Sequence, residues 1–151
     1  MATRTGTETH FATLLQDFVS EQVEASTLCR QAARALETTP ARDVLADLAG
    51  LHERDLHRLR ELAAEFGVEV PEHGTLHEAR TLGRLRLACR REDERGVIAV
   101  VHDSEDRLGA AYERALRNTT LPDTYRPFFE ATSRALRREL RRLDEMEGVA
   151  A

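Results

Sequence analysis

Apolar residues recur at three- and four-residue steps through most of the chain, which places them on one face of an α-helix. Four long segments have this pattern, at about 8–37, 40–66, 93–118 and 123–147, and a shorter one lies at about 75–90. Proline, glycine and polar residues separate them. No segment alternates with the period of two that is typical of a strand. The sequence therefore predicts an all-α protein.

The same stripes predict which side chains face the core, and several polar residues interrupt them. On the first segment the stripe comprises Phe11, Leu15, Phe18, Gln22, Ala25, Cys29, Ala32 and Leu36. On the second it comprises Leu45, Leu48, His52, Leu59, Leu62 and Phe66. On the third long segment Glu105 shares a face with Val101, Leu108 and Tyr112. These polar members are the first candidates for chemistry, because an unpaired buried carboxylate is costly.

Capping residues mark the helix ends. Thr39 is expected to be an N-cap with Pro40 at the first helical position, and Gly67 is expected to end the second helix. Asp93 is the expected N-cap of the third long helix. With Asp123 as N-cap of the last helix, Pro127 falls among the first four residues, where no intrahelical N–H bond is lost.

The connections predict the topology. Very short turns join the first long helix to the second, and the third to the fourth, so each pair forms an antiparallel hairpin. The middle connection of some 25 residues contains the short helix and is long enough to run the length of a bundle. We expect a single domain over residues 1–151, a four-helix bundle of two hairpins joined by one long crossover, which is the ferritin-like arrangement.

Composition narrows the classes of function. The net charge of −5 gives no general attraction to nucleic acid or an anionic membrane, and no run of about 20 apolar residues could span one. Cys29 and Cys89 lie far apart, outside any CxxC pair, and are interpreted as small buried hydrophobes. A bacterial cytoplasmic protein without nucleic-acid or membrane partners is expected. A homodimer is left open, and no protein partner is indicated.

Three stretches resemble an uncharacterised bacterial family of ferritin-like bundle proteins, known only as a domain of unknown function. They are Cys29 to Ala33 on the first helix, Ser104 to Leu116 on the third long helix, and Leu121-Pro122 before the last. The likeness extends over nearly the whole chain in the order and length of its elements. It implies a ferritin-like fold, and metal binding by analogy with that superfamily.

Ferritin-like di-iron sites take one Glu from each of two helices and a Glu-x-x-His pair from each of the other two. Counting residues from the turns places several suitable side chains at a similar level of the bundle. The candidate metal ligands are Glu21, Glu24, His52, Glu53, His102 and Glu105. Their oxygen and imidazole atoms suit iron or manganese. His52 and His102 could equally be hydrogen-bonded to Glu105 or Asp55 in a buried polar network.

The last helix lacks its part of the di-iron pattern, because Glu130 to Ser133 has no histidine in the required place. The arginines of that helix alternate with Glu130, Glu139, Asp144 and Glu145, and are expected to pair with them on a solvated face. The sequence thus favours a metal-free structural, interaction or stress-related bundle with a polar core, without a cofactor or enzymatic activity. The alternative is a ferritin-like protein that binds iron or manganese at a partial carboxylate and histidine site.

Overall fold

The computed structural model describes residues 6–69, 76–118 and 121–150, with side chains for 11–69, 78–118 and 121–146. Five helices make up this part of the chain, and no strand occurs in it. Their bounds are α1 Gly6–Ala35, α2 Ala41–Glu65, α3 Leu76–Arg90, α4 Glu94–Arg117 and α5 Arg126–Ala150. The prediction of an all-α protein is confirmed.

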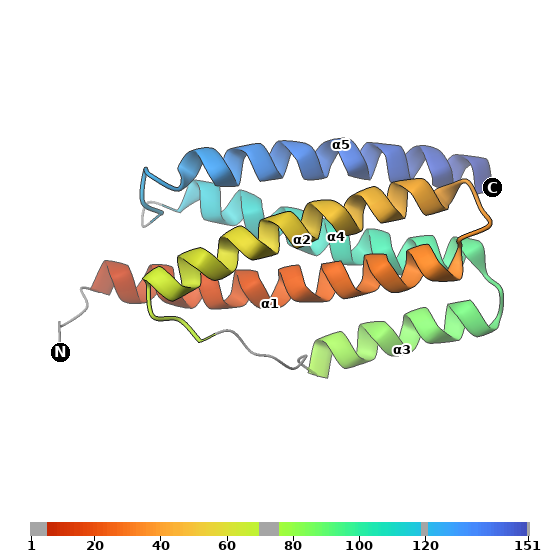
Figure 1. Ribbon diagram of the computed structural model, residues 1–151, viewed down its shortest axis with the longest axis horizontal. Helices are drawn as coiled ribbons and strands as arrows, with labels where there is room; N and C mark the ends of the chain where they lie inside the picture. Colours follow the sequence, from red (N-terminus) through yellow and green to blue (C-terminus); the bar gives the residue numbers. More distant parts are fainter. Residues whose placement is uncertain (1–5, 70–75, 119–120, 151) are drawn as a thin grey trace.

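The four long helices form a bundle in which each packs against two neighbours (Figure 1). Helix α1 lies between α2 and α4, and α5 lies between the same two helices on the opposite side. Along the bundle α1 and α5 run in one direction, and α2 and α4 run in the other (Figure 1). The short helix α3 packs outside the bundle against α4 and α1. Among the described helices, α1 and α5 therefore face each other across the core, as do α2 and α4.

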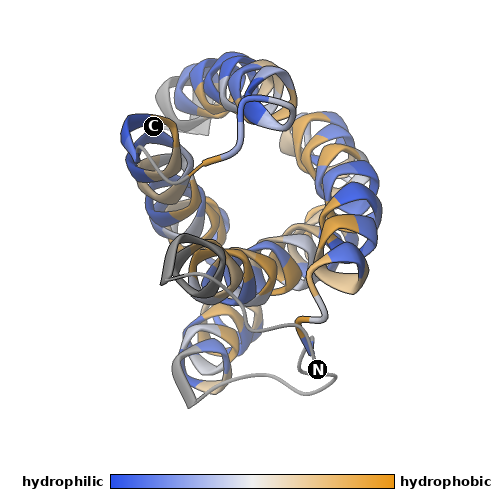
Figure 2. Cartoon of the chain, turned by 90° about the vertical axis from the view of Figure 1, so that its left-hand side faces the viewer, coloured by the Kyte–Doolittle hydropathy of each residue, from blue (hydrophilic) through white to orange (hydrophobic). Residues whose placement is uncertain are grey.

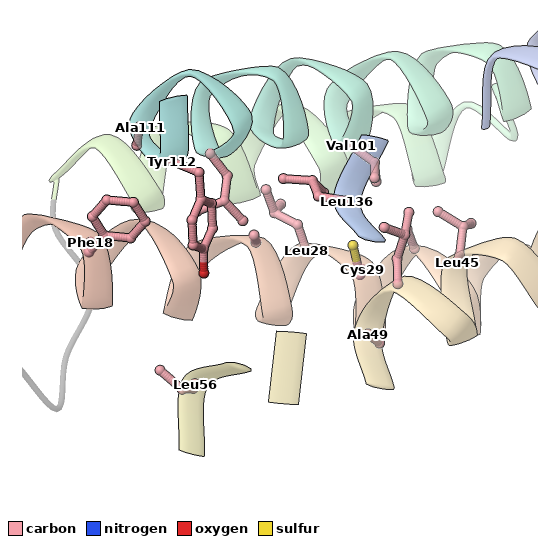
Figure 3. Close-up of a cluster of buried hydrophobic side chains, with 14 of the residues drawn as sticks. Phe18, Leu28, Cys29, Leu45, Ala49, Leu56, Val101, Ala111, Tyr112 and Leu136 are labelled. Carbon is pink, nitrogen blue, oxygen red and sulfur yellow. The ribbon is translucent and has the colours of Figure 1, made fainter. Parts of the chain in front are cut away.

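The hydrophobic faces of the long helices point to the centre of the bundle, and their hydrophilic faces point outward (Figure 2). Aromatic rings fill one part of this core, where Phe18 contacts Tyr112 and Phe129 edge-on at centroid distances of 4.5 and 5.3 Å. Cys29 lies farther along, among Leu28, Leu45 and Leu136 (Figure 3). Burial of these side chains is the main force that holds the helices together, at about 25 cal/mol per Å² of apolar surface.

Two of the predicted helix ends are confirmed. Gly67 has φ 64° and ends α2, with the N–H of Val68 donating to the Ala63 carbonyl and that of Gly67 to Ala64. This is the pair of bonds typical of a glycine helix terminus. Asp93 caps α4, since its side chain accepts a hydrogen bond from the Gly96 N–H at 2.9 Å.

Two other ends differ from the predictions. Thr39 is not an N-cap: its hydroxyl donates to the Leu36 carbonyl, and α2 begins at Ala41 behind Pro40, which is already in the α conformation. Helix α5 begins at Arg126, three residues later than expected, because residues 123–125 form a turn instead. Pro127 is consequently the second residue of α5, where its missing N–H still costs no hydrogen bond.

Candidate functional site

Polar side chains from all four long helices meet inside the apolar core. Each is at least nine-tenths buried, and each occupies a position on its helix stripe, at steps of three or seven residues along the helix. They are Gln22 and Cys29 on α1, His52 and Asp55 on α2, Glu105 and Tyr112 on α4, and Thr132 on α5. We call these seven residues the core polar cluster.

A continuous chain of hydrogen bonds runs through the cluster. The Tyr112 hydroxyl donates to Gln22 Oε1 at 2.8 Å, and the Gln22 amide nitrogen donates to His52 Nδ1 at 2.7 Å. His52 Nε2 then lies 2.6 Å from Glu105 Oε1. The Cys29 thiol donates to that same oxygen at 3.1 Å. The predicted bond between His52 and Glu105 is confirmed.

The hydrogen-bond partners of His52 fit one arrangement of its ring protons. Because Nδ1 accepts from the Gln22 amide, the ring proton is on Nε2, and it is donated to the Glu105 carboxylate. His52 therefore bridges an amide and a carboxylate. The other carboxylate oxygen of Glu105, Oε2, is buried and has no hydrogen-bond partner among the described residues.

Burial changes the acid–base behaviour of the cluster. Desolvation raises the pKa of the Cys29 thiol well above its ordinary value, and the adjacent Glu105 carboxylate adds to that rise. The pKa of Tyr112 is raised well above its ordinary value in the same way, by burial and by Asp55 and Glu105. The thiol and the phenol both therefore hold their protons near neutral pH.

Asp55 occupies a second place in the cluster, one helical turn from His52. Its Oδ1 accepts from the Thr132 hydroxyl at 3.3 Å, and its Oδ2 is buried with no partner among the described residues. Desolvation raises the pKa of Asp55 to about 6, against the opposing effects of His52, of the Thr132 hydrogen bond and of Arg54. Within the cluster, one carboxylate oxygen on Glu105 and one on Asp55 thus lie buried without a donor among the described residues.

Three atoms of the cluster form a candidate set of metal ligands. One ligand atom each from Cys29, His52 and Glu105 lies within 4.8 Å of the other two, and all three residues are fully buried. Ligands at 2.0–2.3 Å from a tetrahedral ion would be separated by roughly 3.3–3.6 Å. The Nε2 to Oε1 distance of 2.6 Å would have to widen by about 0.7 Å, which is within the reach of a side-chain rotation.

The other sequence candidates lie elsewhere. Glu24 is buried but accepts from Arg107 at 2.9 Å in an ion pair between α1 and α4. Glu21 lines a surface hollow beside Arg114, and burial raises its pKa. Glu53 is exposed on α2. His102 is at the surface, with Nε2 2.7 Å from Asp144 and Nδ1 3.2 Å from Asp106.

The di-iron arrangement does not fit this geometry. Glu21, Glu24, Glu53 and His102 do not join His52 and Glu105, so the four carboxylates and two histidines that a di-iron centre needs are not gathered among the described residues. Of the six candidates, His52 and Glu105 lie together, and the other four lie apart from them. What the structure does assemble is a single sulfur, nitrogen and oxygen set.

Three members of the core polar cluster, Gln22, Cys29 and Tyr112, lie on the predicted core stripes but were not among the predicted metal ligands. Gln22 and Tyr112 stand on stripes, and Cys29 follows Gln22 by seven residues, which is two helical turns. Cys29 is buried, as the sequence predicts. Its thiol also donates a hydrogen bond to Glu105, which the interpretation as a hydrophobe does not include. The sequence signal for this cluster is that Gln22 and Cys29, two polar residues, lie seven positions apart on one stripe.

No helix in the part of the chain that the structure describes is both long and apolar enough to cross a membrane. Comparisons of the chain with protein-family models, with curated proteins and with solved structures found no match.

Proposed function

We propose that this protein is a ferritin-like bundle that binds one divalent transition-metal ion through Cys29, His52 and Glu105. The observation that carries the proposal is the approach of a thiol, an imidazole and a carboxylate to within 4.8 Å of one another in full burial. The unpartnered Oε2 of Glu105 supports it, since a buried carboxylate oxygen without a donor is suited to a cation. The ferritin-like topology rests on the long crossover between two antiparallel hairpins.

The donor set favours zinc, or cobalt in its place, over the hard cations. Sulfur and imidazole ligands are typical of zinc, whereas magnesium and calcium take oxygen ligands almost alone. Iron and manganese, the metals of the alternative that the sequence left open, would find a single carboxylate ligand in this set of three residues. Three protein ligands leave a fourth tetrahedral position for water or for Asp55, whose free oxygen is on the same face of α2 as His52.

Binding would require a defined movement of protons. The Cys29 thiol loses its proton to solvent, because the thiolate is the ligand form. The Nε2 proton of His52 must transfer to Nδ1 so that Nε2 can bind. The Gln22 amide can then rotate, so that its oxygen accepts from Nδ1–H and its nitrogen donates to the Tyr112 hydroxyl. Gln22 is therefore able to support both states of His52, and one proton is released for each ion bound.

The test is metal content and metal affinity of the untagged full-length chain. We expect reconstitution with Zn²⁺ to give about one ion per chain and to raise the melting temperature. At a free-ion concentration a hundredfold above Kd, binding should raise the free energy of unfolding by about 2.7 kcal/mol. Co²⁺ should give a thiolate charge-transfer band in the near ultraviolet. Cys29→Ser should abolish that band, and the matched control Cys89→Ser should retain it, because Cys89 lies outside the cluster. Less than about 0.2 ion per chain of zinc, cobalt, iron or manganese after reconstitution would contradict the proposal.

The second candidate is a metal-free bundle whose polar cluster specifies the register of the helices. It is favoured by one observation: Tyr112, Gln22, His52 and Cys29 already satisfy one another and Glu105. Such a network can fix which helix faces meet, because any other register would leave its members unpaired. Under this function Cys29→Ser keeps its hydrogen bond to Glu105 and changes stability little, and no metal is retained.

A further inference from the structure

The outward face of α5 carries four arginines within two helical turns. Arg134, Arg137, Arg138 and Arg141 follow one another at steps of three and four residues, and all four are exposed. Together with Ala131 they line a shallow surface hollow. We call these four residues the arginine stripe.

The stripe is not neutralised by the acidic residues around it. Among the described residues no carboxylate forms an ion pair with any of its four members, and the hydrogen bond found there joins Arg137 to the Ser133 hydroxyl at 3.2 Å. The expected pairing is confirmed for Glu139 and Arg142, but it does not extend to the four arginines of the stripe. Arg142 also binds Asp47, and Asp144 pairs with His102. Like charges at these spacings repel one another, so the stripe destabilises its own helix until an anion binds.

Carboxylates mark both ends of the stripe and so limit the size of its ligand. Glu130 lies four residues before Arg134, and Glu145 lies four residues after Arg141. The positive region between them is about 10 Å long at 1.5 Å per residue. A long polyanion would extend over these carboxylates, on a chain whose net charge is −5. A compact anion with several negative charges fits the positive region alone.

The chemistry of the stripe points to phosphate oxygens. The guanidinium group has a planar fork of donors that binds two phosphate oxygens at once, and neighbouring forks can bind successive phosphates of a chain. No aromatic side chain of the part of the chain that the structure describes lines the hollow, so this lining offers no surface on which a nucleic-acid base could stack. The stripe would therefore recognise a ligand through its phosphate groups and not through a base.

We propose that the arginine stripe of α5 binds a compact polyphosphate anion, either inorganic triphosphate or the triphosphate group of a nucleotide. The stripe is on the outer face of α5, whereas Thr132 of the core polar cluster is on the buried face. The proposal therefore does not depend on the metal site.

The test is calorimetric titration of the full-length chain with inorganic triphosphate at about 50 mM salt, after removal of metals with a chelating resin. We expect binding that weakens as salt rises, and an affinity at least about tenfold lower in Arg137→Gln/Arg138→Gln. The control Arg60→Gln/Arg86→Gln removes the same charge from exposed positions on α2 and α3, and should stay within about twofold of the unmodified chain. Circular dichroism checks that both variants are folded.

Three further arms identify the ligand and separate it from the metal site. Binding of triphosphate should persist in Cys29→Ser. A nucleoside triphosphate that binds as tightly as inorganic triphosphate places recognition in the phosphates, and one that binds more than about tenfold tighter assigns the site to nucleotides. No binding of triphosphate, equal loss in the stripe variant and its control, or tighter binding of single-stranded DNA or anionic vesicles would each overturn the proposal.

Discussion

Asp55 makes the stability of the bundle depend on pH in a direction opposite to that of most aspartates. Its carboxyl group is buried, with a single hydrogen bond from Thr132 and one oxygen without a donor among the described residues. Burial raises its pKa from 3.8 to about 6, so the folded protein favours the protonated form. Asp55→Asn replaces this group by a neutral amide of the same shape, and is the perturbation that isolates its contribution.

The magnitude follows from the two pKa values. Below pH 3.8 the carboxyl is protonated in both the folded and the unfolded chain, and its protonation contributes no penalty. Between 3.8 and about 6 the folded chain holds more protons than the unfolded chain, so the free energy of unfolding falls as pH rises. Above about 6 the folded chain carries a buried charge, and the full loss is about 3 kcal/mol for a shift of about two pKa units.

Urea unfolding followed by far-ultraviolet circular dichroism measures this loss. We expect the free energy of unfolding of Asp55→Asn to exceed that of the unmodified chain by about 1–3 kcal/mol at about pH 7.5, and by much less at about pH 4.5. Glu21 and Glu78 also have raised pKa values. Their effect is the same in both proteins, so the difference between the two pH curves belongs to Asp55.

The outcome that refutes the reasoning is a pair of parallel curves. If Asp55→Asn changes stability by the same amount at both pH values, then Asp55 does not titrate between them in the folded state. Asp47→Asn is the matched control, since Asp47 is exposed and ion-paired to Arg142 at 2.9 Å. This control should show no such difference between the two curves.

Two further substitutions test the turn before α4 and the buried hydrogen-bond chain. Glu92 has φ 52° in the turn that ends α3, a left-handed conformation that strains a residue with a Cβ. Glu92→Gly should therefore raise the free energy of unfolding by about 0.5–1 kcal/mol. The control Glu92→Ala keeps a Cβ and should give no such gain. Tyr112→Phe removes the donor to buried Gln22 Oε1 and should lower the free energy of unfolding by about 1–3 kcal/mol in urea. The control Tyr125→Phe loses a bond to Glu65 at the surface and should cost less; equal costs would contradict the role assigned to the cluster.

The helices could be predicted from the sequence because their stripes depend only on the geometry of one helix. Their ends were less predictable, because local alternatives compete at the turns. The Thr39 hydroxyl could either cap α2 or bond to the end of α1. It donates to the Leu36 carbonyl and does not cap α2. At 123–125 a turn replaces the expected first turn of α5, since the Tyr125 N–H donates to the Pro122 carbonyl.

The candidate site was predictable only in part, because it depends on how the helices rotate against one another. The stripes placed His52 and Glu105 in the core, and they meet there. Glu24 on α1 was one of the candidates at this level of the bundle, but Gln22, two residues earlier, faces His52. Two residues correspond to about 200° around a helix, so counting levels without knowing the rotation selects the wrong face. The rotation is decided by packing across 30 to 76 residues of sequence.

Metal binding and the titration of Asp55 are expected to be coupled, because both concern charge in the same small volume. A divalent ion, together with the loss of the Cys29 thiol proton, adds one positive unit to the charge of the set of Cys29, His52 and Glu105. A positive charge at His52 lowers the pKa of Asp55, and a bound ion would act in the same sense from a neighbouring position. Loading the site should therefore stabilise the ionised form of Asp55 and remove part of the penalty that the bundle carries at neutral pH.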